Sequence, residues 1–84
     1  MKIVFTNHAE KKLKDLEKLG VNVTKSLIKN ILRNPLHVDK ESDPPKKIAS
    51  GMFGEKHLLR VVFREENDII IVITFYPAKK GRYF

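Results

Sequence analysis

The chain has 84 residues, enough for one small domain over residues 1–84 with a single core and no second module. It contains no cysteine, which excludes a disulfide framework, a zinc site with thiolate ligands and a cysteine nucleophile. Seventeen Lys and Arg residues against ten Asp and Glu residues give a formal charge of +7, which favours binding to phosphate backbones or to an acidic protein. The alternative is a solvated basic surface that keeps a small protein in solution.

The apolar segments are too short for membrane insertion or secretion. The longest strongly apolar run, Ile69 to Tyr76, falls far short of the roughly 20 residues that a membrane span needs. The polar residues Thr6-Asn7-His8 follow Ile3-Val4-Phe5 directly, which leaves no apolar region of a signal peptide. We therefore expect a cytoplasmic protein with no membrane partner.

The first third of the chain predicts a short strand and a helix. Ile3-Val4-Phe5 has strand character, and Asn7 with Glu10 three residues later is the pattern of a capping box that opens a helix. Apolar residues then recur at helical spacing, at Ala9, Leu13 and Leu16, and Gly20 favours the end of the helix. The remaining surface of this helix carries Lys11, Lys12, Lys14 and Lys18, either as a solvated face or as contacts to an RNA backbone.

A second helix is predicted directly after the first. Asn22 or Thr24 can cap it, and Asn34-Pro35 ends it. Its apolar stripe consists of Leu27, Ile28, Ile31 and Leu32. Because only a few residues separate the two helices, we expect a helical hairpin that packs on one side of a sheet.

The rest of the chain predicts strands. Residues 36–38 and 48–50 have weak strand character, and the polar segment 39–47 with Pro44-Pro45 is typical of a loop. The clearest hairpin joins residues 57–64 to residues 69–76 around Glu65-Glu66-Asn67-Asp68.

The alternation of side chains in this hairpin predicts its register. If the connection has an odd number of residues, Glu65 opposes Ile69, Arg60 opposes Thr74 and Leu58 opposes Tyr76. One face then holds Leu59, Val61, Phe63, Ile71, Ile73 and Phe75, and the other holds Arg60, Arg64, Thr74 and Tyr76. An even connection would place Arg60 among the isoleucines, where a charge is costly. We therefore expect the odd register and a half-polar face available for a ligand.

The end of the chain gathers cations and phenols. The apolar run leaves through Tyr76-Pro77 and is followed by Lys79, Lys80, Arg82 and Tyr83, with no acidic residue after Asp68. Such a group is suited to binding an anionic substrate, and it could also catalyse the cleavage of a bond in that substrate. An ordinary solvated tail is the alternative.

Together these features resemble the RelE/ParE superfamily of type II toxin–antitoxin toxins. The shared features are a short first strand, a helical hairpin, an arginine in the penultimate strand and a basic, aromatic end. The segments Thr6-Asn7-His8-Ala9 and Phe75-Tyr76-Pro77-Ala78-Lys79-Lys80 also resemble small uncharacterised relatives in that neighbourhood. The resemblance implies an α+β fold in which the N-terminal strand and the helical hairpin pack on one face of an antiparallel sheet of about four strands.

The resemblance also implies a ribosome-dependent endoribonuclease that cuts mRNA without a metal or other cofactor, and a cognate acidic antitoxin as partner. In this chemistry the ribose 2′-hydroxyl attacks the neighbouring phosphate, so the reaction needs a base, cations and an acid. Arg60 would clamp the phosphate, and Lys79, Lys80 and Arg82 lie where the family has its second cation. Tyr83 would stack on a base or transfer a proton, and Lys46-Lys47 or Lys56 would supply an earlier cationic pair.

His8 is a candidate base because a histidine near the positive end of a helix dipole favours the neutral imidazole. It is equally compatible with a plain surface position. The candidate catalytic residues are Arg60, Lys79, Lys80, Arg82, Tyr83 and His8, and the candidate substrate-binding residues are Tyr76, Arg64, Thr74, Lys46 and Lys47. The three histidines are widely spaced and lack paired carboxylates, so no metal site is expected.

Two other functions fit the same residues. A non-catalytic module would use the basic face to bind RNA or an acidic partner. A gyrase-inhibiting toxin of the ParE type would share the fold without the ribonuclease residues, because fold alone does not define the target.

Overall fold

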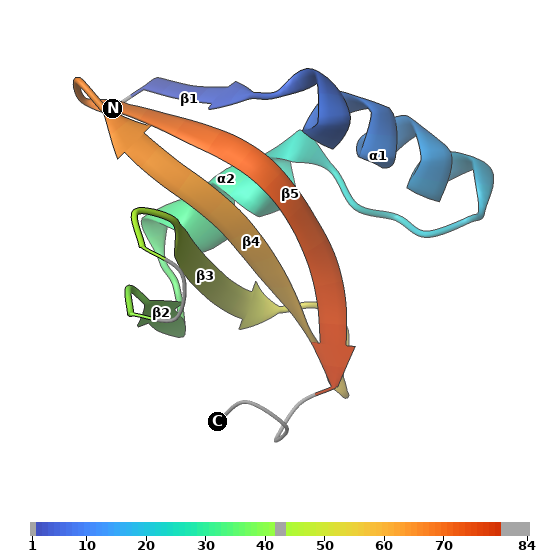
Figure 1. Ribbon diagram of the computed structural model, residues 1–84. Coiled ribbons are helices and arrows are strands. Elements are labelled where there is room, and N and C mark those ends of the chain that lie inside the picture. The colour runs from blue at the N-terminus through green and yellow to red at the C-terminus, as the bar shows by residue number, and fades with distance from the viewer. Residues whose placement is uncertain (1, 42–43, 80–84) are drawn as a thin grey trace.

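The protein has an α+β fold in which two helices pack on a mixed five-stranded sheet, as the computed structural model shows (Figure 1). The structure describes residues 2–41 and 44–79. Its elements are β1 (Lys2–Phe5), α1 (Asn7–Lys18), α2 (Lys25–Arg33), β2 (His37–Asp39), β3 (Lys47–Met52), β4 (His57–Glu66) and β5 (Ile69–Lys79). Within these residues, no helix is long and apolar enough to cross a membrane.

The strands lie in the order β1-β5-β4-β3-β2. β1 runs parallel to β5, whereas the other neighbouring pairs are antiparallel. The expectation of a purely antiparallel sheet of about four strands is therefore corrected. β1 is the edge strand beside β5 and runs parallel to it, and the three residues of β2 add the fifth strand at the opposite edge.

Thr6 starts α1 and joins it to the sheet. Its hydroxyl oxygen accepts a hydrogen bond from the Ala9 amide at 3.2 Å and donates one to the Ile73 carbonyl at 3.1 Å. Its amide donates to the Val72 carbonyl at 3.0 Å. The predicted capping box of Asn7 and Glu10 is thus wrong by one residue, because Thr6 serves the helix and the sheet with one hydroxyl.

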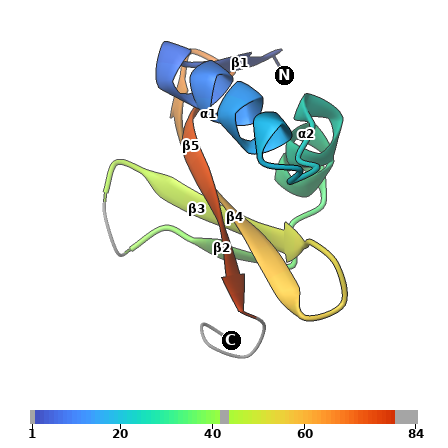
Figure 2. The same cartoon turned by 90° about the vertical axis from the view of Figure 1, so that its right-hand side faces the viewer.

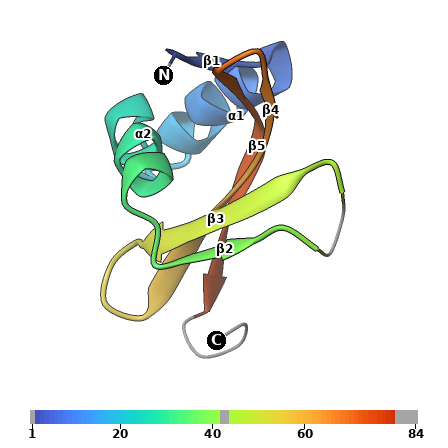
Figure 3. The same cartoon turned by 90° about the vertical axis from the view of Figure 1, so that its left-hand side faces the viewer.

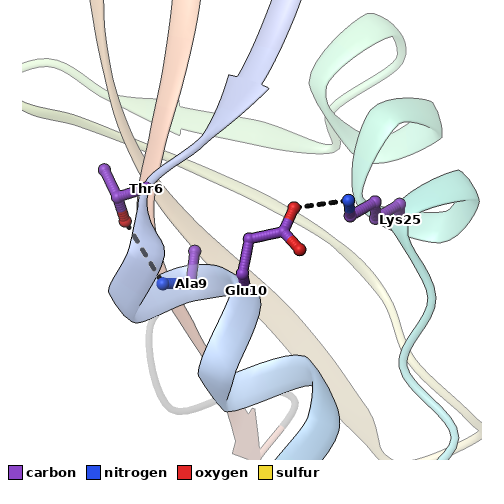
Figure 4. A network of polar contacts seen from close by, with 4 residues as sticks. All are labelled: Thr6, Ala9, Glu10 and Lys25. Carbon is purple, nitrogen blue, oxygen red and sulfur yellow. Dashed lines mark hydrogen bonds and ion pairs between the residues drawn. The ribbon is translucent and has the colours of Figure 1, made fainter.

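Glu10 joins the two helices instead. Its carboxylate forms an ion pair with the ammonium of Lys25, at the start of α2 (Figure 4). The same ammonium lies 5.3 Å from the centroid of the Phe5 ring, so Lys25 also contacts β1. The predicted cap Thr24 is confirmed, since its hydroxyl accepts from the Leu27 amide at 3.1 Å.

The helices cover one face of the sheet and leave part of it beyond them. Figures 2 and 3 show α1 and α2 together at the end of the sheet where β1 lies, while the ends of β4 and β5 at His57 and Lys79 extend past both helices. The core joins the helical residues Ala9, Ile28 and Ile31 to Leu59, Val61, Phe63, Ile70, Val72 and Phe75 of β4 and β5.

The turn between β4 and β5 has two residues, Asn67 and Asp68, both with positive φ angles of 49° and 64°. Two left-handed residues suit the twist of a tight hairpin. Glu66 therefore opposes Ile69, and the expected odd connection is wrong. The strands also continue past the predicted ends, because Glu65 and Glu66 remain in β4 and Pro77 lies within β5.

A bulge then shifts the register. Phe63 opposes Val72 but Val62 opposes Thr74, so Ile73 is one extra residue in β5. Because the two-residue turn is followed by one extra residue, the residues of β5 after Ile73 lie on the predicted faces of the sheet. Before the bulge the expectation fails, because Ile70 and Val72, rather than Ile71 and Ile73, belong to the core.

We name the sheet face opposite the core the far face; between the bulge and Leu58 it carries Leu58, Arg60 and Val62 of β4 and Thr74 and Tyr76 of β5. Side chains of α1 reach the edge of this face at Thr74. The prediction that Arg60, Thr74 and Tyr76 share a face is confirmed. Their pairing is different from the prediction, because Arg60 opposes Tyr76, Leu58 opposes Ala78 and Thr74 opposes Val62.

Replacing Thr6 tests the joint between α1 and the bulge. We expect Thr6→Val to lower the free energy of unfolding by about 1–2 kcal/mol more than Thr6→Ser, because valine keeps the shape and loses both hydroxyl bonds. Urea denaturation followed by circular dichroism measures the difference. Thr24→Val is the matched control, since in the described part of the chain the Thr24 hydroxyl caps α2 and bonds no strand. Equal losses for the two valine variants would contradict the role of the Ile73 bond.

Gly51 allows close packing between α2 and β3. A Cβ atom at this position would lie 2.6 Å from Cγ1 of Ile31. We expect Gly51→Ala to lower the free energy of unfolding by about 1–3 kcal/mol through overpacking. Met52→Ala, at the next and exposed position, should cost less than about 1 kcal/mol in the same urea titration. A Gly51→Ala protein with the stability of the original chain would contradict this packing.

Candidate functional site

Arg60 occupies the middle of the far face. It pairs with Tyr76 across β4 and β5 and with Ser50 across β4 and β3. Its guanidinium carbon lies 5.9 Å from the centroid of the Tyr76 ring, which is a cation–π distance. Only 6% of Arg60 is exposed, and Ser50 and Leu58 on the same face are also buried. The expected half-polar face is therefore not uniformly open to a ligand.

A second group of polar side chains meets at Thr74, where α1 begins beside β5. The Thr74 hydroxyl oxygen lies 3.4 Å from the ammonium of Lys12 and 3.3 Å from Nε2 of His8. His8 and Lys12 are four residues apart and so lie on one face of α1. The Lys12 ammonium also lies 5.5 Å from the centroid of the Phe75 ring, which is a cation–π distance.

The two groups adjoin and form what we call the Thr74 site, consisting of His8, Lys12, Arg60, Thr74 and Tyr76. Thr74 and Tyr76 are separated by two residues of one strand, roughly 7 Å. Arg60 is the diagonal neighbour of Thr74 across the strands, at roughly 7–8 Å between Cα atoms. Exposure falls from His8, which is exposed, through the half-buried residues to Arg60. The site is therefore most accessible from the side of α1.

The described lysine at the end of β5 lies elsewhere. Lys79 opposes His57 and has the opposite parity to Tyr76, so it does not share the face of Arg60. It is five residues beyond Thr74, roughly 17 Å along an extended strand. Figure 1 shows this end of β5 far from the start of α1. The predicted residues Lys80, Arg82 and Tyr83 lie outside the described residues.

The other predicted cations also lie apart from the Thr74 site. Lys47 opposes Phe63, on the helix side, and its ammonium bonds the Glu65 carboxylate at 2.9 Å. Lys46 is exposed just before β3. Arg64 is on the far face, four residues from Arg60, and its Nε lies 3.7 Å from a carboxylate oxygen of Glu66.

In the Thr74 site, His8 is exposed at one side and Arg60 is buried at the other. A hollow of about 350 Å³ lies between the helices, lined by Glu10, Leu13, Lys14, Glu17, Val21, Asn22, Val23, Thr24 and Lys25, and another of about 280 Å³ is lined by His37 to Glu41. Neither includes a residue of the Thr74 site. Over residues 2–41 and 44–79, no three His, Asp or Glu side chains come together to hold a metal ion.

Lys12 is the member of the site that sequence reasoning did not single out. It is one of four lysines of α1, and the spacing from His8 is the only local sign of its position. Its partner Thr74 is 62 residues away in the chain, so only the folded structure distinguishes Lys12 from Lys11 and Lys14.

Comparison with protein-family models, with curated proteins and with solved structures gave no match to this chain.

The contact between Arg60 and Tyr76 can be measured by a double-mutant cycle. We expect Arg60→Met and Tyr76→Leu to show a coupling of about 0.5–2 kcal/mol in the free energy of unfolding, because the cation lies over the ring away from water. Urea denaturation of the original chain, the two single variants and the double variant gives this value. Additive effects would show that the two side chains do not stabilise each other.

Proposed function

We propose that this chain is a relative of the RelE/ParE toxins and cleaves mRNA without a metal, using the Thr74 site. The order of one strand, two helices and then a sheet of further strands supports a RelE-like fold, although a parallel β1 and a fifth strand extend the expected layout. The observation that carries the proposal is that the His8 imidazole and the Lys12 ammonium contact Thr74, while the Arg60 guanidinium contacts Tyr76 two residues further along β5. These are the groups that phosphodiester transfer needs.

Each group has a role in the proposed reaction. His8 takes the proton of the ribose 2′-hydroxyl, and the 2′-oxygen forms a bond to the adjacent phosphorus. Lys12 and Arg60 face the negative charge that develops on the phosphoryl oxygens, and the low dielectric around buried Arg60 strengthens its attraction. The bond from phosphorus to the 5′-oxygen breaks, and this oxygen takes a proton from water or from the Lys12 ammonium. The products are a 2′,3′-cyclic phosphate and a 5′-hydroxyl.

We attribute RNA binding to the positive charge of the chain and to stacking of a base on an aromatic ring. The formal charge of +7 attracts an RNA backbone, and Arg64 offers a further cation on the far face. The half-buried ring of Tyr76 presents a surface on which a base can stack, an interaction worth about 1–3 kcal/mol. The proposal includes a cytoplasmic location, action on the ribosome and a cognate acidic antitoxin, for which the same charge is suited.

A non-catalytic RNA-binding module is the second candidate. The separation of Lys79 from Arg60 and the burial of Arg60 favour it, because a reaction site needs its cations at one phosphate. In that case the Thr74 site holds RNA, and His8 contributes a contact rather than a proton transfer.

Expression in a bacterial host, with primer extension on cellular mRNA, tests the proposal. We expect growth arrest and new mRNA ends with the original chain. His8→Ala should lower the cleavage rate by about 10²–10⁴-fold, the usual share of a general base. Lys12→Ala should also protect mRNA, whereas Lys14→Ala, the matched change at an exposed position of the same helix, should not.

Verified soluble expression is the control for every variant. Cleavage that persists unchanged in His8→Ala and Lys12→Ala would contradict the assignment of the site. RNA binding by the original chain with intact mRNA and normal growth would favour the binding module over the ribonuclease.

A further inference from the structure

Thr74 brings together two nitrogen groups that come from another part of the chain. Its hydroxyl oxygen faces Nζ of Lys12 at 3.4 Å and Nε2 of His8 at 3.3 Å, although His8 is 66 residues away in sequence. The contact uses Nε2 and does not involve Nδ1, the other ring nitrogen of this exposed histidine. The Thr74 hydroxyl therefore contacts one particular nitrogen of the His8 ring, Nε2.

Thr6 holds the start of α1 against β5 through hydrogen bonds to both elements. Thr6 bonds the carbonyls of Val72 and Ile73 immediately before Thr74, and it caps the helix that carries His8 and Lys12. The start of α1 therefore cannot shift along β5 without breaking these bonds. A side chain on β5 can orient a side chain on α1 only when the two elements are held in this way.

The hydrogen-bonding capacity of the Thr74 hydroxyl allows two arrangements with His8. The oxygen has two lone pairs and one hydrogen, and a lysine ammonium can only donate. Lys12 therefore uses one lone pair of the Thr74 oxygen. The second lone pair can accept the Nε2–H of His8, in which case Nδ1 carries no proton. Alternatively, the hydroxyl hydrogen can be donated to an unprotonated Nε2, which leaves the ring proton on Nδ1. Only the first arrangement leaves a basic nitrogen for the proposed reaction.

We propose that Thr74 is a positioning residue that holds the Nε2–H tautomer of His8, so that Nδ1 is the atom that accepts the 2′-hydroxyl proton. This inference rests on the proposed function. In the step, the proton moves from the 2′-oxygen to Nδ1, the 2′-oxygen bonds to phosphorus, and the electrons of the breaking bond remain on the 5′-oxygen, which is protonated as described above. A hydrogen bond that selects the tautomer of a catalytic imidazole is a general device for aiming its basic nitrogen.

The first test reads the tautomer without any reaction. Nitrogen-15 NMR of the histidine rings at a pH where the imidazoles are neutral distinguishes a protonated from an unprotonated ring nitrogen. We expect Nε2–H to dominate for His8 in the original chain and in Thr74→Ser, which keeps the hydroxyl. Thr74→Val keeps the shape but removes the acceptor, so the His8 signals should move toward the tautomer mixture of exposed His57, an internal reference.

Two results would overturn the inference. One is a His8 ring whose signals are the same in the original chain and in Thr74→Val. The other is a dominant Nδ1–H tautomer in the original chain, since that nitrogen would then have no lone pair for the proton. Backbone amide spectra of both variants control for loss of the fold.

Cleavage kinetics then separate positioning from binding. We expect Thr74→Val to lower kcat by about 10- to 100-fold with little change in KM, the scale seen when a group that orients an imidazole is removed. Thr74→Ser should restore most of the rate. A changed KM with unchanged kcat would contradict positioning, and absence of cleavage by the original chain would overturn the ribonuclease proposal while the NMR result still decides the contact.

Discussion

The hydrogen bond from the Thr6 hydroxyl to the carbonyl of Ile73 is the contact on which the candidate site depends. Ile73 is the extra residue of β5, and without the bulge Thr74 would share the core face of the sheet with Val72 and Phe75 would leave the core. The same hydroxyl begins α1, so the bulge and the first turn of the helix are fixed together. The positions of His8, Lys12 and Tyr76 relative to Arg60 all follow from this joint.

The sequence predicted the helices and the hairpin but not the register. Ala9 and the apolar stripe that includes Ile28 and Ile31 recur at helical spacing, and these three residues enter the core. In contrast, residues 69–73 are all isoleucine or valine, so no alternation distinguishes the two faces of this part of β5. The bulge depends on a bond between residues 67 apart, which no local pattern reveals.

The sequence predicted part of the candidate site, because some of its residues are placed by local patterns and others by contacts between distant residues. Arg60 was predicted to lie on the polar face because a charge in the apolar core is costly. The prediction is confirmed although the predicted length of the turn is wrong. Lys79 is close to Tyr76 in sequence, but β5 continues through Pro77 and carries the lysine to the other parity. Lys12 belongs to the site because its ammonium contacts Thr74, which is distant in sequence. The predicted binding residue Lys47 lies on the helix side, opposite Phe63, where it bonds Glu65.

The most direct measurement is an NMR titration of the protein with a short single-stranded RNA whose 2′-hydroxyls are methylated, so that binding occurs without cleavage. We expect the side-chain and amide signals of His8, Lys12, Thr74, Tyr76 and Arg60 to shift together with one affinity, and we expect the shifts to weaken as the salt concentration rises. Shifts confined to Lys79, Lys47 or the outer lysines of α1, with the signals of the Thr74 site unchanged, would contradict it.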